Sequence, residues 1–169
     1  MKTKPPTEAA ASPCLSCGET MASHRENYRY VESGLPNIIL VGVEVRRCRG
    51  CGEFELVIPK MAQLHRLVAD VISKKTERLT HHEVRFLRKH IGWSGVDFAR
   101  NFGVTPETVS RWESGAQNIN PMAERLLRIL TLSHEPVLDY SILERVGSEA
   151  PKKGRQFRIS LQKDWALAA

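Results

Sequence analysis

The chain has 169 residues, of which 25 are Lys or Arg and 19 are Asp or Glu, so its formal net charge is +6. This length fits one ordinary domain or two small ones, and an apolar share of 41% argues against wholesale disorder. The sequence contains no run of about 20 apolar residues that would span a membrane. The N-terminus lacks the apolar core of a secretory signal. We therefore expect a cytoplasmic protein without a membrane partner.

The positive charge is unevenly distributed. Residues 1–57 hold seven basic and seven acidic side chains, residues 58–150 hold thirteen and eleven, and residues 151–169 hold five and one. The basic excess therefore lies toward the C-terminus. A basic segment favours an anionic partner, with nucleic acid before membrane.

The N-terminal third changes from a polar segment to strand-like runs. Residues 1–13 have little to bury and are predicted to form a flexible lead. In residues 14–58, β-branched and aromatic residues favour strands at 28–32 and 38–45, separated by the turn signal SGLPN. Residues 59–76 then show apolar side chains at helical spacing, which predicts a connecting helix.

Residues 77–147 are predicted to be helical, with a capping residue at each helix start. Thr80, followed by Glu83, forms a capping box. The next three helices begin near Ser94, Thr105 and Asn120. A fifth helix is expected at 137–146. Residues 148–169 form a basic tail with a strand at 156–161, for which the sequence indicates no partner.

Four cysteines occur as two CxxCG pairs, and this repetition points to a metal site. Zinc prefers four soft ligands in a tetrahedron, and each pair supplies two thiolates from one tight turn. The sequence therefore predicts one structural Zn²⁺ per chain, which would stabilise a unit of about 45 residues with little core of its own. Two disulfides, a redox pair or free thiols are the alternatives, and disulfides are disfavoured inside cells. The predicted ligands are Cys14, Cys17, Cys48 and Cys51.

The segment SGVDFARNFGVTPETVSRWESG has the spacing of a helix-turn-helix. Val96, Phe98, Ala99 and Phe102 form the apolar side of the first helix, and Gly103 permits a left-handed turn. The outward side chains of the second helix can enter a major groove, where Arg contacts guanine and a carboxylate accepts from cytosine. A helix pair of purely architectural function is the alternative. The candidate DNA contacts are Thr105, Pro106, Glu107, Thr108, Ser110, Arg111, Gln117 and Asn118.

These motifs resemble known families. TVSRWESG preceded by FARNFGV resembles the Xre/Cro-like helix-turn-helix. CLSCG and CRGCG, placed around ESGLPN and ahead of such a domain, resemble the MqsA (YgiT-type) zinc-finger antitoxins. The resemblance spans residues 14–132. It implies a small α+β zinc-ribbon-like N-terminal domain followed by an all-α five-helix Xre/Cro-like helix-turn-helix domain.

The resemblance also implies a function. Such proteins form homodimers, bind palindromic operators in double-stranded DNA and repress transcription. The best-known ones neutralise a toxin, an mRNA-cleaving ribonuclease, through the zinc domain. The four cysteines match the zinc ligands and Arg111 matches a base-contacting position, whereas Glu107 and Gly95 replace amide side chains that are common in these families.

We therefore expect a sequence-specific repressor that is the antitoxin of a type II toxin–antitoxin pair and is nucleoid-associated when bound to DNA. A stand-alone regulator without a toxin, or a mainly protein-binding module, are the alternatives. An enzyme is not expected, because four thiolates leave no open metal position. The sequence also shows neither a His/Glu constellation nor a phosphate-binding glycine loop.

Overall fold

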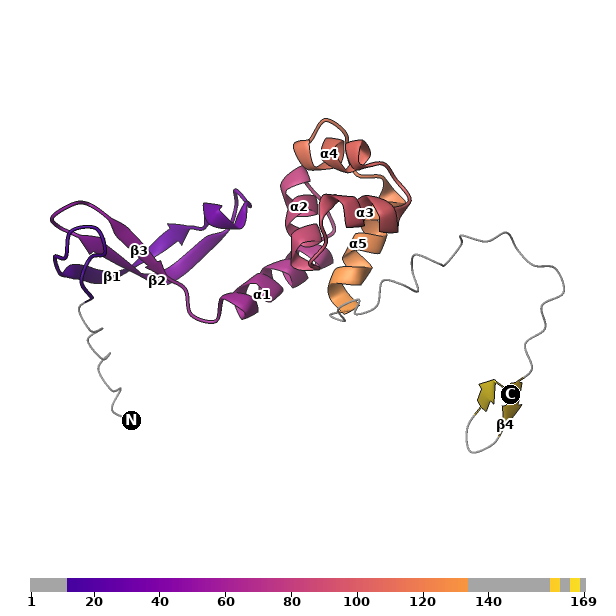
Figure 1. Cartoon of the computed structure of the whole chain (residues 1–169), viewed down its shortest axis with the longest axis horizontal. Coiled ribbons are helices and arrows are strands. Elements are labelled where there is room, and N and C mark those ends of the chain that lie inside the picture. The colour runs from indigo at the N-terminus through magenta and orange to yellow at the C-terminus, as the bar shows by residue number, and fades with distance from the viewer. Residues whose placement is uncertain (1–11, 134–158, 162–164, 168–169) are drawn as a thin grey trace. The chain divides into compact units, whose positions relative to one another are not determined.

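The computed structural model describes residues 12–133, 159–161 and 165–167. A small three-stranded antiparallel sheet comes first and is followed by a region of five helices (Figure 1). This arrangement confirms the expected fold class. The helix expected at 137–146 lies outside the described residues, as does nearly all of the expected N-terminal lead.

The sheet is built around its longest strand. β1 (Met21–Arg29) pairs antiparallel with β2 (Ile39–Cys48), which also pairs with β3 (Phe54–Val57). At one end of the β1–β2 ladder Met21 lies opposite Cys48, and the register shifts at a bulge between Glu26 and Tyr28. The ladder thereby connects the cysteine-bearing end of the sheet to the hairpin tip around Tyr30.

The prediction of a strand at 28–32 is wrong in its bounds, because only residues 28 and 29 of that range belong to β1. The strand occupies Met21–Arg29, and Val31–Ser33 forms a single 3₁₀ turn, η1, that ends at Gly34 with φ of 77°. The polar stretch from Ser23 to Asn27 has weak strand propensity, and its pairing with the β-branched β2 overrides that preference. β3 was not predicted, since its four residues are too few for a clear alternation.

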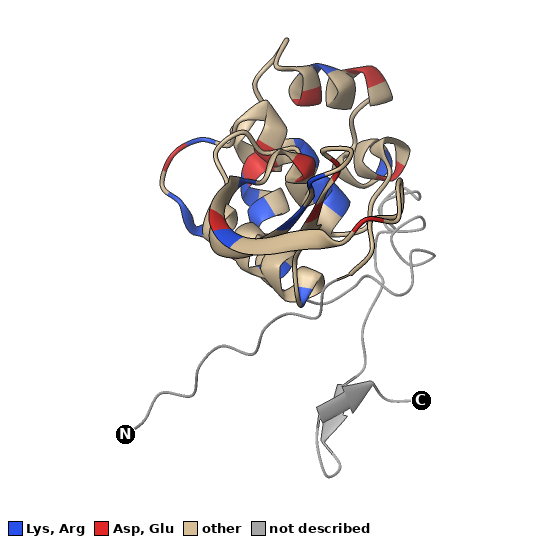
Figure 2. Ribbon diagram, turned by 90° about the vertical axis from the view of Figure 1, so that its left-hand side faces the viewer, with Lys and Arg blue, Asp and Glu red and all other residues tan. Residues whose placement is uncertain are grey.

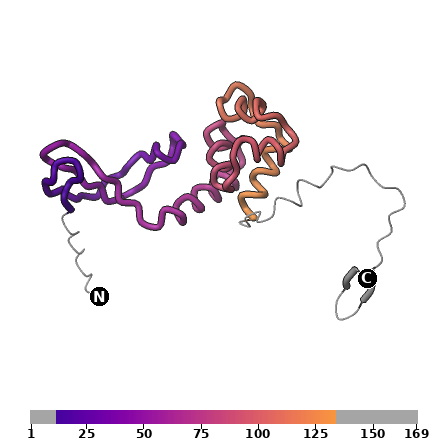
Figure 3. The backbone as a smooth tube through the Cα atoms, viewed as in Figure 1, coloured from indigo at the N-terminus to yellow at the C-terminus, as the bar shows by residue number. Residues whose placement is uncertain are grey.

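The helices begin at the positions that the capping residues predicted. Thr80 and Ser94 each form a complete capping box, and Thr105 precedes Pro106 at the first helical position. Lys60, with a left-handed φ of 53°, directly precedes the first helix. Figure 3 shows the course of the backbone from the sheet into the helices. The helices are α1 (Met61–Lys74), α2 (His81–His90), α3 (Gly95–Phe102), α4 (Pro106–Ser114) and α5 (Pro121–Ser133).

The helices pack around a common apolar core. α3 packs on α4, α2 contacts both α4 and α5, and α1 packs on α5. Val96, expected on the apolar side of α3, is instead 56% exposed because Phe98 and Ala99 already fill the packing face. None of the helices in the described ranges has the length and hydrophobicity needed to cross a membrane. The largest fully buried core side chains of this region are Leu87, Phe98, Trp112 and Leu127.

A ring contact joins the hairpin tip to the helices. Tyr30, which is 5% exposed, stacks on His65 of α1 with ring centroids 6.0 Å apart. The Tyr30 hydroxyl lies 3.0 Å from Nε2 of His65, and the His65 ring meets Phe86 of α2 edge-on at 6.0 Å. The hairpin tip therefore contacts α1 directly and α2 through His65, at the end of the sheet opposite its cysteines.

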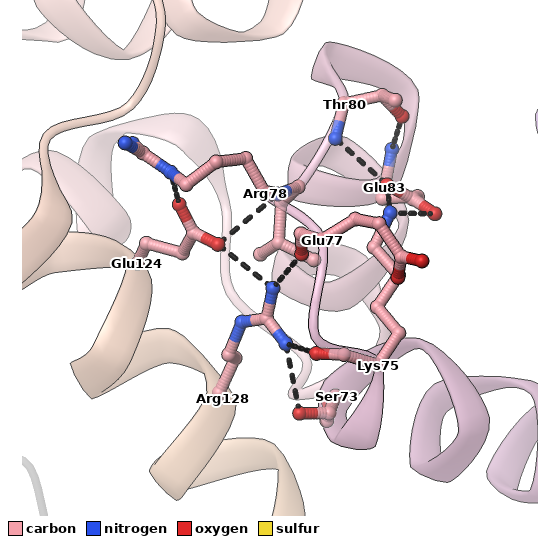
Figure 4. A network of polar contacts seen from close by, with 9 residues as sticks. Ser73, Lys75, Glu77, Arg78, Thr80, Glu83, Glu124 and Arg128 are labelled. Carbon is pink, nitrogen blue, oxygen red and sulfur yellow. Dashed lines mark hydrogen bonds and ion pairs between the residues drawn. The ribbon is translucent and has the colours of Figure 1, made fainter.

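A polar network closes the α1–α2 connection against α5 (Figure 4). The Arg128 guanidinium donates to the carbonyls of Ser73 at 3.1 Å and of Lys75 and Glu77 at 2.5 Å each. It also donates to Glu124 at 2.8 Å. This side chain therefore satisfies the Ser73 carbonyl in the last turn of α1 and two carbonyls of the connection that follows.

The strand predicted in the tail has a partner nearby in sequence. β4 (Ile159–Leu161) pairs antiparallel with β5 (Trp165–Leu167) as a separate two-stranded sheet. β5 was not predicted, because a strand of three residues is too short to show a clear alternation.

Glu124 provides a test of the network. Burial raises the pKa of this carboxyl, but the Arg128 and Arg78 guanidiniums and the Leu79 N–H outweigh it, so the net shift is downward. A carboxylate with a lowered pKa stabilises the fold above its ordinary pKa, and this stabilisation is lost as the pH falls through the folded value. Glu124→Gln should thus lower the free energy of unfolding by about 3 kcal/mol at pH 7, as measured by urea denaturation.

The matched control for this prediction is Glu77→Gln. Glu77 is exposed and contributes its backbone carbonyl to the network, so this change should alter the unfolding free energy by no more than about 0.5 kcal/mol. The difference in unfolding free energy between wild type and Glu124→Gln should shrink as the pH falls below 4.5, the ordinary pKa of this carboxyl. A difference independent of pH would contradict the charge-based account.

Candidate metal centre and nucleic-acid interface

The two CxxCG turns have the same backbone hydrogen bonds. In the first, the Cys14 N–H donates to the Glu19 carbonyl at 2.7 Å and the Gly18 N–H donates to the Cys14 carbonyl at 2.9 Å. Gly18 and Gly52, the glycines that follow the two cysteine pairs, have left-handed φ values of 79° and 77°. This conformation costs glycine little. The second turn repeats both bonds, from Cys48 to Glu53 at 2.8 Å and from Gly52 to Cys48 at 3.1 Å.

The four predicted ligands converge. Their Sγ atoms all lie within 4.8 Å of one another, with Cys17 and Cys48 at 3.3 Å and Cys14 and Cys51 at 3.6 Å. Tetrahedral thiolate coordination with Zn–S bonds of about 2.3 Å places sulfur atoms about 3.8 Å apart. The donor set and its spacing therefore fit a tetrahedral metal ion, and the four cysteines are free of disulfides.

The two cysteines of each pair have different surroundings. Cys14 and Cys48 are each 3% exposed and pack with Met21 in a small core, whereas Cys17 and Cys51 are exposed. Hydrogen bonding from the Cys51 N–H, with contributions from Cys17 and the Gly50 N–H, lowers the pKa of Cys48 to about 7. The same contact between the two sulfurs raises the pKa of Cys17 to about 12, so within this pair the thiolate that metals bind forms first on Cys48.

The helix-turn-helix has the predicted local geometry. Gly103 ends α3 with φ of 63°, and the Val104 N–H donates to the Ala99 carbonyl at 3.0 Å. Thr105 then caps α4, accepting from the Thr108 N–H at 3.3 Å. The Phe98 and Trp112 rings meet edge-on at 6.2 Å, which fixes α4 against α3.

The structure leaves the predicted DNA contacts at the surface. Arg111 lies one turn after Glu107, and the Arg111 carbonyl accepts from the Gln117 N–H at 3.1 Å, which ties the following loop to the end of α4. The carboxylate of Glu107 has a lowered pKa because its own N–H and the Thr105 hydroxyl bond to it, with a smaller contribution from Arg111. Thr108 is half-buried, and exposed are Thr105, Pro106, Glu107, Ser110, Arg111, Gln117 and Asn118.

The sequence analysis missed a buried ion pair behind this surface. Glu113 of α4 is 9% exposed and accepts from Arg88 of α2, which is also 9% exposed, including a bond of 3.0 Å. Arg85 adds bonds of 3.3 Å to the Glu113 carboxylate and 3.1 Å to its carbonyl. The signal was present, because Glu113 follows the core residue Trp112 and lies four residues after the core residue Val109.

A comparison with known protein families matches residues 84–132 to the helix-turn-helix family. Residues 84–132 form a helix-turn-helix domain of the Xre/Cro-like type. The domain indicates a DNA-binding regulator, with α4 in the position of the recognition helix. No curated protein matches the chain.

Proposed function

We propose that this protein is a dimeric, sequence-specific transcriptional repressor that binds a palindromic operator in double-stranded DNA through α4. The observation that supports this most is the exposed polar face of α4, held by buried contacts inside a helix-turn-helix domain. Two such helices in a symmetric homodimer would enter major grooves about 34–36 Å apart. In this proposal the protein is cytoplasmic, associates with the nucleoid when bound to DNA, and is not an enzyme.

Arg111 is the residue on which this proposal depends most. It is exposed on α4, and an arginine in the major groove can donate two hydrogen bonds to guanine. Arg111→Ala should weaken operator binding by about 5- to 150-fold, which is the effect of losing one bidentate base contact. Footprinting and a binding titration on the DNA upstream of the gene would measure this loss.

The control for Arg111→Ala is Lys89→Ala, which removes an exposed cation of α2 outside the helix-turn-helix pair. This change should leave the footprint in place. Footprinting should also reveal an inverted repeat, as a symmetric dimer requires. Equal binding by wild type and Arg111→Ala would show that α4 is not the recognition helix.

We further propose that the four cysteines hold one structural Zn²⁺. Thiolate sulfur is the ligand that structural zinc prefers, and the closed four-sulfur set leaves no position for a reactive water. When bound, the metal would supply folding free energy to a sheet whose own core is small. The cysteines themselves join the start of β1 to the end of β2, since Cys14 and Cys17 precede β1 and Cys48 ends β2.

Metal analysis of the purified chain tests this part. We expect one zinc per chain, and Cys48→Ser should lower the zinc content well below this value because a thiolate is removed. Ser16→Ala, in the same turn as Cys14 and Cys17, is the matched control and should keep a full complement. Chelation in denaturant should release four reactive thiols. Absence of such thiols would instead indicate the alternative of two disulfides.

The zinc domain is proposed to bind a toxin, an mRNA-cleaving ribonuclease, so that the protein is the antitoxin of a type II pair and autoregulates its operon. Two observations support a protein partner here. Residues 1–57 have no net positive charge, which gives little reason to contact DNA. Ile39 and Val41 lie on one face of β2 and are 62% and 78% exposed, and neighbouring exposed apolar side chains can contribute to a protein-binding surface.

Co-expression with the product of the adjacent gene tests the antitoxin function. A ribonuclease encoded there should co-purify with the wild-type chain, and Ile39→Glu with Val41→Glu should abolish this while leaving the DNA footprint unchanged. The DNA footprint is the control for folding. If the neighbouring product does not bind, the protein is the alternative, a stand-alone regulator with a zinc domain and a helix-turn-helix.

A further inference from the structure

The face that α4 presents to solvent contains few groups able to contact a base. Pro106 has no polar side-chain atom, and the two serines, Ser110 and Ser114, can act as either donor or acceptor. Arg111 is the one side chain of this face that only donates, and Glu107 is the one that only accepts. Figure 2 colours the ribbon by charge, and basic and acidic residues are interspersed along the described elements.

Glu107 is held ready to accept a hydrogen bond. It is exposed in the first turn of α4, near the positive end of the helix, and its own N–H and the Thr105 hydroxyl lower the pKa of its carboxyl. Within the described part of the chain, neither Lys nor Arg approaches this carboxylate to ion-pair distance. Its remaining lone pairs therefore point to solvent or to whatever α4 contacts.

A carboxylate in a major groove tolerates only certain bases. Guanine and thymine present acceptor oxygens there, adenine presents an amino group beside the N7 acceptor, and cytosine presents an amino donor alone. An acceptor-only side chain is repelled by the first two and is best matched by cytosine. The surrounding phosphates also repel it, so the carboxylate weakens binding unless a base amino group compensates.

We propose that Glu107 is a specificity-determining residue that requires a cytosine at one position of each half-site. This proposal rests on the proposed DNA-binding function of α4. Glu107 and Arg111 are four residues apart, about one turn or 5.4 Å along the helix, and base pairs are spaced by about 3.4 Å. The cytosine therefore lies within about two base pairs of the guanine that Arg111 contacts.

Selection of bound duplexes from a randomised DNA library tests this requirement. The full chain would be compared with Glu107→Gln and Glu107→Ala. The wild type should enrich cytosine at the Glu107 position, and any other base there should weaken its binding by about 5- to 150-fold. Glu107→Gln should enrich adenine at the same position, because an amide pairs with N6 and N7. Glu107→Ala should enrich no base there, and both variants should keep the Arg111 guanine.

A second measurement isolates the amino group. In the selected duplex the cytosine is replaced by 2-pyrimidinone, which lacks only that group. Wild-type binding should fall by the same factor as for a wrong base, while Glu107→Ala should lose less than about twofold. A carboxylate that only stabilises the first turn of α4 would change thermal stability in both variants but no base preference.

The outcomes separate this proposal from the proposed function. If all three proteins enrich one identical sequence, Glu107 does not determine specificity and this proposal is overturned, while the repressor function stands. If the wild type enriches no sequence and Arg111→Ala binds equally well, both are overturned. Circular dichroism of each variant checks that α4 remains folded.

Discussion

The recognition surface depends on the buried carboxylate of Glu113. Without its partners this charge could not remain in the interior at acceptable cost, and Arg88 and Arg85 of α2 hold it from two directions. Arg88 also donates to the Trp93 carbonyl at 2.6 Å, which ties the α2–α3 connection to the same group. One residue of α4 thus fixes its position against two other elements, and the outward face follows from that constraint.

Internal pairing of basic side chains explains why a chain with a net positive charge presents a nearly neutral surface on α4. In residues 12–133 several cations are held by internal carboxylates or carbonyls, among them Lys75, Arg78, Arg85, Arg88 and Arg128. They serve to join helices and contribute little to an attractive field at α4. In the proposed function, base selection on this surface would rest on the type of hydrogen-bonding group more than on net charge.

The sequence predicted those elements whose causes are local. Capping boxes at Thr80 and Ser94 and the paired CxxCG turns are short-range chemistry, and the structure reproduces them. The bounds of β1 were not predicted, because its pairing with β2 overrides the local preference. The partners of Glu113, and the contacts of Glu124 with Arg78 and Leu79, were not predicted because they join residues 25 or more positions apart. Periodicity assigns charged residues to the surface, so the spacing from Val109 that places Glu113 on the packing side of α4 was not used.

The unequal surroundings of the four cysteines set a direction for metal exchange. Cys14 and Cys48 are locked into the core by Met21 and by the backbone bonds of their turns, whereas Cys17 and Cys51 are open to solvent. If the four cysteines held a metal ion, a chelator in solution would reach the sulfurs of Cys17 and Cys51 before those of Cys14 and Cys48. Exchange of such an ion would therefore depend on the solvent-facing side of the site, even though both sides supply ligands.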